Sequence, residues 1–501
     1  MKNFNIKYTS LVVVTTLILS MTVTSCKKAI EIDPVDYVNS ETALSSKAGI
    51  DAGIVTAYAL LKGEVMYGNR MIGLGEALSD NGRSTNRSGR YVSEAVNSSG
   101  SHYSNWTTSY YGLNLINQIL EAIPNLNVTG VTDATKASWI GELKFLRALY
   151  HFDLVKEYAY IPGAVVAAQD RGGVPIISKS TTTADAALAT KSSRNSLTEV
   201  YDFIYSDLTD AVSKLSDIGS SPSRANKQAA QALFSRVALY RKDWANVIAY
   251  STPVITSRGS TLLTSANYVT GWTSAVNPES LFEVTFAASG ESLGVNVSLQ
   301  TLFTSLKVRG DRTQKGGYGD LVPTNDLVSK LGITVTNNGS TTAAITARSS
   351  DVRNQLFELG ATAYTTAYIE CTKFLGRSGA INLDNVPVIR ISEAYLNRAE
   401  AYYFSGNEPL ALADVNKIRT NRGLTASTAT GTALWDEILL QRRLEFAFEG
   451  QRFMDLKRNG LDIYKPVSGV TVAFTNFVIL PSIPTNDVDA SSGNLKQNYG
   501  Y

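Results

Sequence analysis

The densest group of reactive side chains lies near the end of the chain, within residues 442–458. Glu445 and Glu449 stand four residues apart, which places both carboxylates on one face of a helix. Two carboxylates at a fixed separation are what a glycoside hydrolase needs. Arginines surround this pair, however, and arginine neighbours lower the pKa of a carboxylate, the wrong direction for a general acid. We therefore interpret these charges as structural ion pairs between buried helices.

Other catalytic chemistries have few residues to work with. The 501 residues include two His and two Cys, too few for a His-rich metal site or a disulfide framework. The 46 Lys and Arg stand against 44 Asp and Glu, which leaves no basic surplus for binding nucleic acid. No P-loop, Rossmann fingerprint, G-x-S-x-G elbow, H-E-x-x-H motif or EF-hand spacing occurs. We expect no catalytic residue, cofactor, metal or nucleic-acid partner.

The first cysteine has a different chemistry. Lys2 and Lys7 precede the apolar stretch 11–19, which is too short for a good membrane span and fits a secretory signal. The segment 23–26 (VTSC) places small residues directly before Cys26, and this resembles the lipobox of bacterial lipoproteins. We expect cleavage before Cys26 and acylation of this residue, whose several acyl chains would anchor the protein stably.

Binding residues are easier to find than catalytic ones, because the chain has 25 Tyr and 5 Trp. Sugars present flat C–H faces that stack on aromatic rings, while their hydroxyl groups seek Asn, Asp and Arg. The polar segments 80–104 and 260–320 combine both kinds of side chain. The candidate ligand-binding residues are Asp80, Asn81, Arg83, Arg87, Tyr91, His102, Tyr103, Tyr268, Trp272 and Tyr318. We expect Trp106, Trp139, Trp244 and Trp435 to pack in the core.

Helical periodicity dominates the segments that must position these residues. It predicts helices at about 43–62, 104–122, 134–160, 226–241, 243–257, 388–405, 409–421 and 432–458. A capping box, Ser196 with Glu199, predicts the start of a further helix. The stretch 260–380 is rich in Ser, Thr, Gly and Asn, and it predicts short strands and long loops.

A weak internal repeat supports helical pairs. Ala232, Arg236 and Tyr240 have the same spacing as Ala394, Arg398 and Tyr402, each set within the first helix of a predicted pair. A small residue followed one turn later by an aromatic one resembles tetratricopeptide packing, in which helix pairs stack into a scaffold.

Several motifs in order along the chain resemble one family, the SusD/RagB-like outer-membrane lipoproteins of polysaccharide-utilisation systems. The motifs are 32–34 (IDP), 143–154 (LKFLRALYHFDL), 171–177 (RGGVPII), 319–327 (GDLVPTNDL), 351–353 (DVR), 388–401 (VIRISEAYLNRAEA), 416–424 (NKIRTNRGL), 438–458 (ILLQRRLEFAFEGQRFMDLKR), 480–484 (LPSIP) and 497–501 (QNYGY). One local departure is Gln441, where the family more often has Glu before Arg.

The resemblance implies a mostly α fold, a tetratricopeptide-like helix-pair scaffold with a loop-rich insert containing short strands. The implied organisation is a signal peptide at 1–25, a lipid anchor and tether at 26–40 and a single domain at 41–501, with helical scaffold at 41–258 and 387–458, a ligand-face insert at 260–386 and an irregular tail at 459–501.

The resemblance also implies a function. The protein is expected on the outer membrane, facing the cell exterior, where it captures oligosaccharide or polysaccharide and delivers it to a SusC-like TonB-dependent transporter. Two alternatives stay open: a surface glycoside hydrolase, and a lipoprotein that captures peptides instead of sugars.

Overall fold

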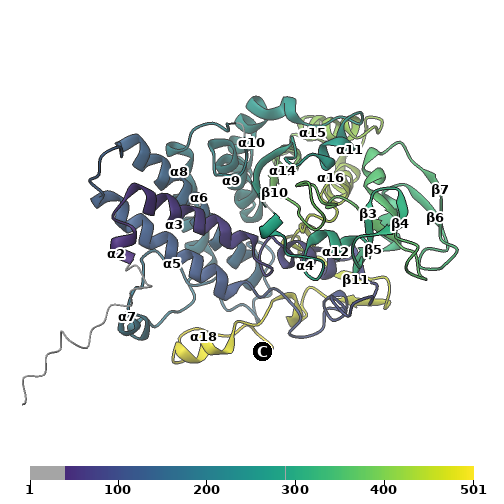
Figure 1. Cartoon of the computed structure of the whole chain (residues 1–501). Helices are drawn as coiled ribbons and strands as arrows, with labels where there is room; N and C mark the ends of the chain where they lie inside the picture. Colours follow the sequence, from purple (N-terminus) through teal and green to yellow (C-terminus); the bar gives the residue numbers. More distant parts are fainter. Residues whose placement is uncertain (1–39, 220, 288) are drawn as a thin grey trace, which may run out of the picture.

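The computed structural model describes residues 40–219, 221–287 and 289–501 (Figure 1). The predicted signal peptide, Cys26 and the predicted tether as far as residue 39 lie outside these residues. Helices built from the first half of the chain gather at one end of the molecule, and most strands lie at the other (Figure 1). In the part of the chain that is described, no helix has the length and apolar character needed to cross a membrane.

The secondary structure is mostly helical, as the sequence predicts. The helices are α2 (Ser40–Ala43), α3 (Lys47–Ala59), α4 (Arg70–Ala77), α5 (Trp106–Ala122), α6 (Asp133–Tyr158), α7 (Ala184–Ala189), α8 (Leu197–Lys214), α9 (Lys227–Arg241), α10 (Trp244–Arg258), α11 (Tyr268–Thr273), α12 (Leu299–Phe303), α13 (Asn325–Lys330), α14 (Ile391–Phe404), α15 (Glu408–Asn421), α16 (Gly431–Glu445), α17 (Arg452–Arg458) and α18 (Thr485–Ala490).

The strands form two-stranded antiparallel pairs. They are β1 (Gly82–Ser84), β2 (Ser280–Val284), β3 (Leu306–Val308), β4 (Asp311–Lys315), β5 (Leu321–Pro323), β6 (Ile333–Thr336), β7 (Ala344–Arg348), β8 (Phe357–Leu359), β9 (Ile369–Cys371), β10 (Val386–Arg390), β11 (Ile463–Lys465) and β12 (Val470–Val472). The pairs are β1–β5, β2–β10, β3–β4, β6–β7, β8–β9 and β11–β12. Most of the strands fall within the predicted insert, so short strands there are confirmed.

Helix pairs make up the scaffold, which confirms the tetratricopeptide-like prediction. α9 packs on α10, and Lys242, with φ +58°, turns the chain between them. α14 packs on α15 and on α10, with Gly406 at φ +74° ending one helix and Pro409 opening the next. The predicted capping box is also present, since Ser196 accepts a hydrogen bond from the Glu199 amide at 3.2 Å and the Glu199 carboxylate accepts one from the Ser196 amide.

Two predicted helix boundaries were wrong. The helix expected from 388 starts at Ile391, because the preceding residues form β10 and pair with β2. The helix expected over 432–458 is broken into α16 and α17. Gly450 has φ +82° there and lies so close to α4 that a Cβ on Gly75 would come within 2.1 Å of its carbonyl oxygen. This backbone contact requires the break, and only glycine fits at both positions.

Candidate functional site

Three segments far apart in sequence meet on one surface beside the strands of the insert. β1 pairs with β5, with Arg83 opposite Val322, and this brings the loop after β1 next to the β4–β5 connection. The Thr85 amide extends the contact by donating to the Asp320 carbonyl at 2.8 Å. β8 pairs with β9, whose connection holds Tyr364 and Tyr368, and β9 also lies against β5. The strand pairs therefore place three loops side by side.

Arg87 ties the three loops together. Its Nη1 donates to the Tyr318 carbonyl oxygen at 2.8 Å, and its Nη2 donates to the Thr366 carbonyl oxygen at 2.8 Å. Nη1 also forms an ion pair with Oε1 of Glu370 at 2.6 Å. A planar guanidinium can satisfy these acceptors at once because its donors diverge in a fixed fork. One side chain thus links the three loops that the strand pairs bring together.

The buried Glu370 holds the Arg87 guanidinium in place. Its carboxylate is fully buried and accepts hydrogen bonds from the Ser305 amide at 2.6 Å and from the Thr304 hydroxyl at 3.1 Å. Burial raises the pKa of Glu370, and the positive charge of Arg87 opposes this shift. A Cβ on Gly360 would come within 2.0 Å of this carboxylate, so the backbone passes it as closely as glycine allows.

Half-buried tyrosine rings cover the cations of these loops. The guanidinium carbon of Arg87 lies 4.2 Å from the Tyr364 ring centre, and that of Arg83 lies 4.8 Å from the Tyr368 ring centre. The Lys315 Nζ is 4.6 Å from the Tyr364 ring and 5.4 Å from the Tyr318 ring. We call this set the tyrosine–arginine surface; it comprises Arg83, Arg87, Arg90, Lys315, Tyr318, Tyr364 and Tyr368. It offers aromatic faces beside hydrogen-bond donors, the combination that suits a sugar ring.

Three of the predicted candidates come together on this surface: Arg83, Arg87 and Tyr318. Tyr364 and Tyr368 were missed, although the sequence held a signal for them. They stand four residues apart in the polar segment 361–368 (ATAYTTAY) of the predicted insert, the composition that drew attention to the other loops.

Four other candidates from the 80–104 loop are buried, namely Asn81, Tyr91, His102 and Tyr103, and Asp80 is largely buried. Asp80 is ion-paired with Arg452 at 2.7 Å, and Asn81 accepts from Arg443 at 2.8 Å. Tyr91 donates to the Asn69 side chain at 2.5 Å. The rings of His102, Tyr103 and Phe453 pack together, and burial holds the pKa of His102 well below its usual range. In this structure these contacts place the five residues in the packing of the fold.

Tyr268 and Trp272 are fully buried and cover a cluster of ion pairs. The Arg422 guanidinium carbon lies 4.4 Å from the Tyr268 ring centre, and Lys373 Nζ lies 4.8 Å from the Trp272 ring centre. We call the cluster the buried network; it comprises Arg353, Lys373, Arg390 and Arg422 with Glu279, Asp351, Glu445 and Glu449. Both rings therefore belong to the core in this conformation.

The buried network contains the two carboxylates that could have suggested a glycosidase. Arg390 pairs with Glu279 at 2.5 Å, with Glu445 at 3.1 Å and with Glu449 at 2.8 Å. Burial opposes the ionisation of Glu445, but Arg422 and Arg390 outweigh it and hold its pKa well below the usual range. Glu445 is thus an ionised, enclosed structural group, as the sequence predicts.

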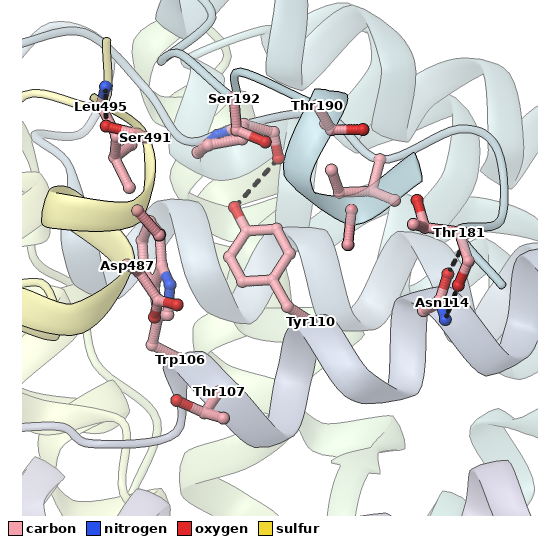
Figure 2. A pocket seen from close by; sticks show the side chains of 14 residues that line it. Trp106, Thr107, Tyr110, Asn114, Thr181, Thr190, Ser192, Asp487, Ser491 and Leu495 are labelled. Carbon is pink, nitrogen blue, oxygen red and sulfur yellow. Dashed lines mark hydrogen bonds between the residues drawn. The ribbon is translucent and has the colours of Figure 1, made fainter. Parts of the chain in front are cut away.

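A separate concavity of about 430 Å³ lies on the helical side (Figure 2). Its floor is α5, and its walls are the 175–192 segment and α18. The Tyr110 hydroxyl donates to the Pro175 carbonyl at 3.0 Å, and Asn114 donates to the Thr181 carbonyl at 3.0 Å, so these polar groups are already engaged (Figure 2). Among the described residues that line it, Asp487 is the one carboxylic acid, with a pKa raised by burial, and none is cationic.

The side chains of the described residues do not assemble a metal site: no group of three or more His, Cys, Asp or Glu lies close enough to hold an ion. Cys371 is buried, and burial raises the pKa of its thiol to about 12, which leaves it protonated and unreactive at neutral pH.

Comparison with known proteins identifies the family of this chain. A family model described as "Starch-binding associating with outer membrane" matches residues 32–239, and that of the SusD family matches residues 362–501. SusD-like protein P38 of Formosa agariphila is 23% identical over 514 aligned positions, covering 94% of this chain and 95% of that protein.

Solved structures share the whole fold. A SusD superfamily protein from Bacteroides vulgatus matches with a TM-score of 0.76 and 25% identity, covering 91% of this chain and 99% of its own. A laminarin-binding SusD-like protein matches with a TM-score of 0.68 and 21% identity, covering 91% and 100% of the two chains. The family motifs, the helix-pair scaffold and these matches agree, and the chain is a SusD/RagB-like protein, one of a family of carbohydrate-binding proteins associated with the outer membrane.

Proposed function

We propose that this protein is a surface glycan-binding lipoprotein that captures oligosaccharide or polysaccharide on the tyrosine–arginine surface. Acylation of Cys26 anchors it to the outer membrane facing the exterior, and it delivers its ligand to a SusC-like TonB-dependent transporter. The observation that carries the proposal is the set of partly exposed rings, Tyr318, Tyr364 and Tyr368, arranged beside hydrogen-bond donors on rigidly connected loops.

The geometry favours binding over bond cleavage. The carboxylates that pair with cations of this surface are Glu370 and Asp320, and both are fully buried and engaged by arginines. A glycosidase needs one protonated and one ionised carboxyl group on either side of the scissile bond, both in contact with the sugar. Neither of these groups reaches the face that the tyrosines cover.

Binding to a glycan panel tests the function. Affinity electrophoresis and titration calorimetry should show binding of at least one glycan, and Tyr318→Ala, Tyr364→Ala and Tyr368→Ala should each weaken it about tenfold. Tyr111→Ala is the matched control, because Tyr111 is 62% exposed on α5, away from the strands, and its loss should leave binding unchanged.

Other outcomes would contradict the proposal in specific ways. Binding of peptides without any glycan would favour peptide capture. Release of products from a polysaccharide, abolished by a single carboxylate substitution, would favour a hydrolase.

The anchor and the transporter partner have separate tests. Cys26→Ala should move the protein from the membrane fraction to the soluble one, and the protein purified from its own cells should bring a transporter barrel with it. Failure of either test would remove the corresponding part of the proposal.

A further inference from the structure

The tyrosine–arginine surface carries more positive than negative charge. Its four cations are Arg83, Arg87, Arg90 and Lys315, and its carboxylates are Glu370 and Asp320. We infer that the glycan bound there is anionic, carrying carboxylate or sulfate groups. This inference rests on the proposed function and specifies the ligand of the same site.

Two of the four cations are neutralised inside the fold. Arg87 pairs with Glu370 at 2.6 Å, and Arg90 pairs with Asp320 at 2.6 Å, while both carboxylates have no exposed surface. The Ser88 amide also donates to Asp320 at 3.0 Å. These two arginines and two carboxylates form closed pairs that position the loops and leave no free charge.

The other two cations have no carboxylate partner among the described residues. Arg83 is half-buried under Tyr368, and its Nε has no hydrogen-bond partner among the described residues. Lys315 is exposed, and its Nζ approaches the rings of Tyr318 and Tyr364. A cation over a tyrosine ring keeps donors free at its outer edge, so one anionic group can approach each of them beside an aromatic face.

The carboxylate on the same hairpin as Lys315 forms no ion pair with its ammonium group. It belongs to Asp311, four residues away at the opposite end of β4. Its oxygens accept from Thr313 and Gln314, each at 2.6 Å. The Asp311 carboxylate is thus engaged by its own strand neighbours, while the Lys315 ammonium lies toward the Tyr318 and Tyr364 rings.

The concavity of Figure 2 provides an internal contrast. Its described lining residues include Asp487 and no cation, so it lacks the positive charge with which the tyrosine–arginine surface can attract an anionic sugar. Binding of an acidic glycan should therefore respond to substitutions at one face alone.

Calorimetry on the full mature chain tests the inference with alginate and carrageenan oligosaccharides as anionic probes and with laminarin and amylopectin oligosaccharides as neutral ones. We expect at least tenfold tighter binding of an anionic probe than of the neutral ones, and weaker binding of that probe as salt rises from 50 to 200 mM. Arg83→Gln and Lys315→Gln should each lower its affinity about fivefold and reduce the salt dependence. Lys47→Gln, at an exposed position of α3, is the charge-matched control and should change nothing.

The outcomes separate the two proposals. Tighter binding of a neutral probe, unaffected by Lys315→Gln, overturns the anionic ligand and leaves the glycan-binding function intact. Binding of an anionic probe that both Arg83→Gln and Lys315→Gln leave unchanged overturns the assignment to this surface. Absence of binding to every glycan, with the protein folded by circular dichroism, overturns the proposed function itself.

Discussion

Two clusters in this protein place arginines against aromatic rings, and they differ in burial and in charge balance. In the buried network, four cations meet four carboxylates beneath Trp272 and Tyr268, and all of them are enclosed. On the tyrosine–arginine surface, four cations meet two carboxylates, and the rings of Tyr318, Tyr364 and Tyr368 are partly exposed.

The difference shows which property separates structure from recognition. A charge removed from water is tolerated only when an opposite charge and hydrogen bonds compensate it, so a buried cluster must be balanced. An exposed cluster has water to solvate an excess cation until a ligand replaces that water. Aromatic rings over arginines are common to both clusters, and therefore the uncompensated charge, more than the ring, marks the binding face.

Removal of Arg390 should have the largest effect, because it breaks the balance of the buried network. Arg390→Met leaves Glu279, Glu445 and Glu449 short of a cation in the core, and we expect the free energy of unfolding to fall by about 3–5 kcal/mol. Urea denaturation measures it. Arg241→Met is the control, because its pair with Asp202 is partly exposed to solvent and should be worth less than about 1 kcal/mol. Equal losses in both variants would show that burial does not distinguish the two kinds of pair.

Glu157 is a buried carboxylate without an arginine, and it sharpens the comparison. Neither of its oxygens has a hydrogen-bond partner among the described residues, and the nearest cation, Lys156 Nζ, is 4.0 Å away. Burial raises its pKa to about 8, whereas the arginines hold the pKa of Glu445 well below its usual range. The same degree of burial thus shifts these two carboxyl groups in opposite directions, because three arginines pair with Glu445 and no described arginine pairs with Glu157.

The raised pKa of Glu157 predicts that Glu157→Gln increases the free energy of unfolding by an amount that depends on pH. The folded protein holds a proton that the unfolded chain releases above pH 4.5, the ordinary pKa of a glutamate, so this group lowers stability as pH rises from there to about 8. The free energy of unfolding of the variant should equal that of the wild type at pH 4.5 and exceed it by about 2 kcal/mol at pH 8. Thermal unfolding at both pH values measures the difference, and a gain of the same size at both would exclude the titration as its cause.

The helical scaffold could be predicted from the sequence because its determinants are local. Apolar spacing marks each helix, and the capping box at Ser196 and the Gly406–Pro409 turn mark their ends. The structural role of Glu445 was also predictable, but its partners were not. The arginines of its own segment pair elsewhere, as Arg452 does with Asp80, and Glu445 pairs with the distant Arg390 and Arg422. The break between α16 and α17 was not, because it depends on the approach of α4, which lies far away in sequence.

The site was only partly predictable for the same reason. Trp272 and Tyr318 both lie in polar, loop-like sequence, and composition alone predicts a ligand contact for both equally. What covers Trp272 comes from distant parts of the chain, such as Arg390, whose guanidinium carbon lies 5.3 Å from its ring centre and which pairs with Glu279, 111 residues away. What exposes Tyr318 is the β1–β5 pairing, which leaves its loop at the surface. Neither contact has a signal within a window of neighbouring residues.

The smallest effect we expect concerns Arg87, which belongs to the surface but is paired as if it were in the core. Arg87→Lys keeps the charge and the ion pair with Glu370, but a single ammonium cannot also reach the carbonyl oxygens of Tyr318 and Thr366. The free energy of unfolding should fall by about 1 kcal/mol, the value of one or two hydrogen bonds. Because the loops would lose their common anchor, glycan affinity should also fall about fivefold.

Salt dependence shows which role Arg87 has. If Arg87 positions the tyrosines, Arg87→Lys weakens binding by the same factor at 50 and 200 mM salt, because no charge has been removed. Lys315→Gln, in contrast, should reduce the salt dependence itself, because it removes a charge that meets the ligand. If Arg87→Lys left affinity unchanged while lowering stability, Arg87 would belong with Arg390 as a structural residue, and the recognition face would shrink to the residues around Arg83 and Lys315.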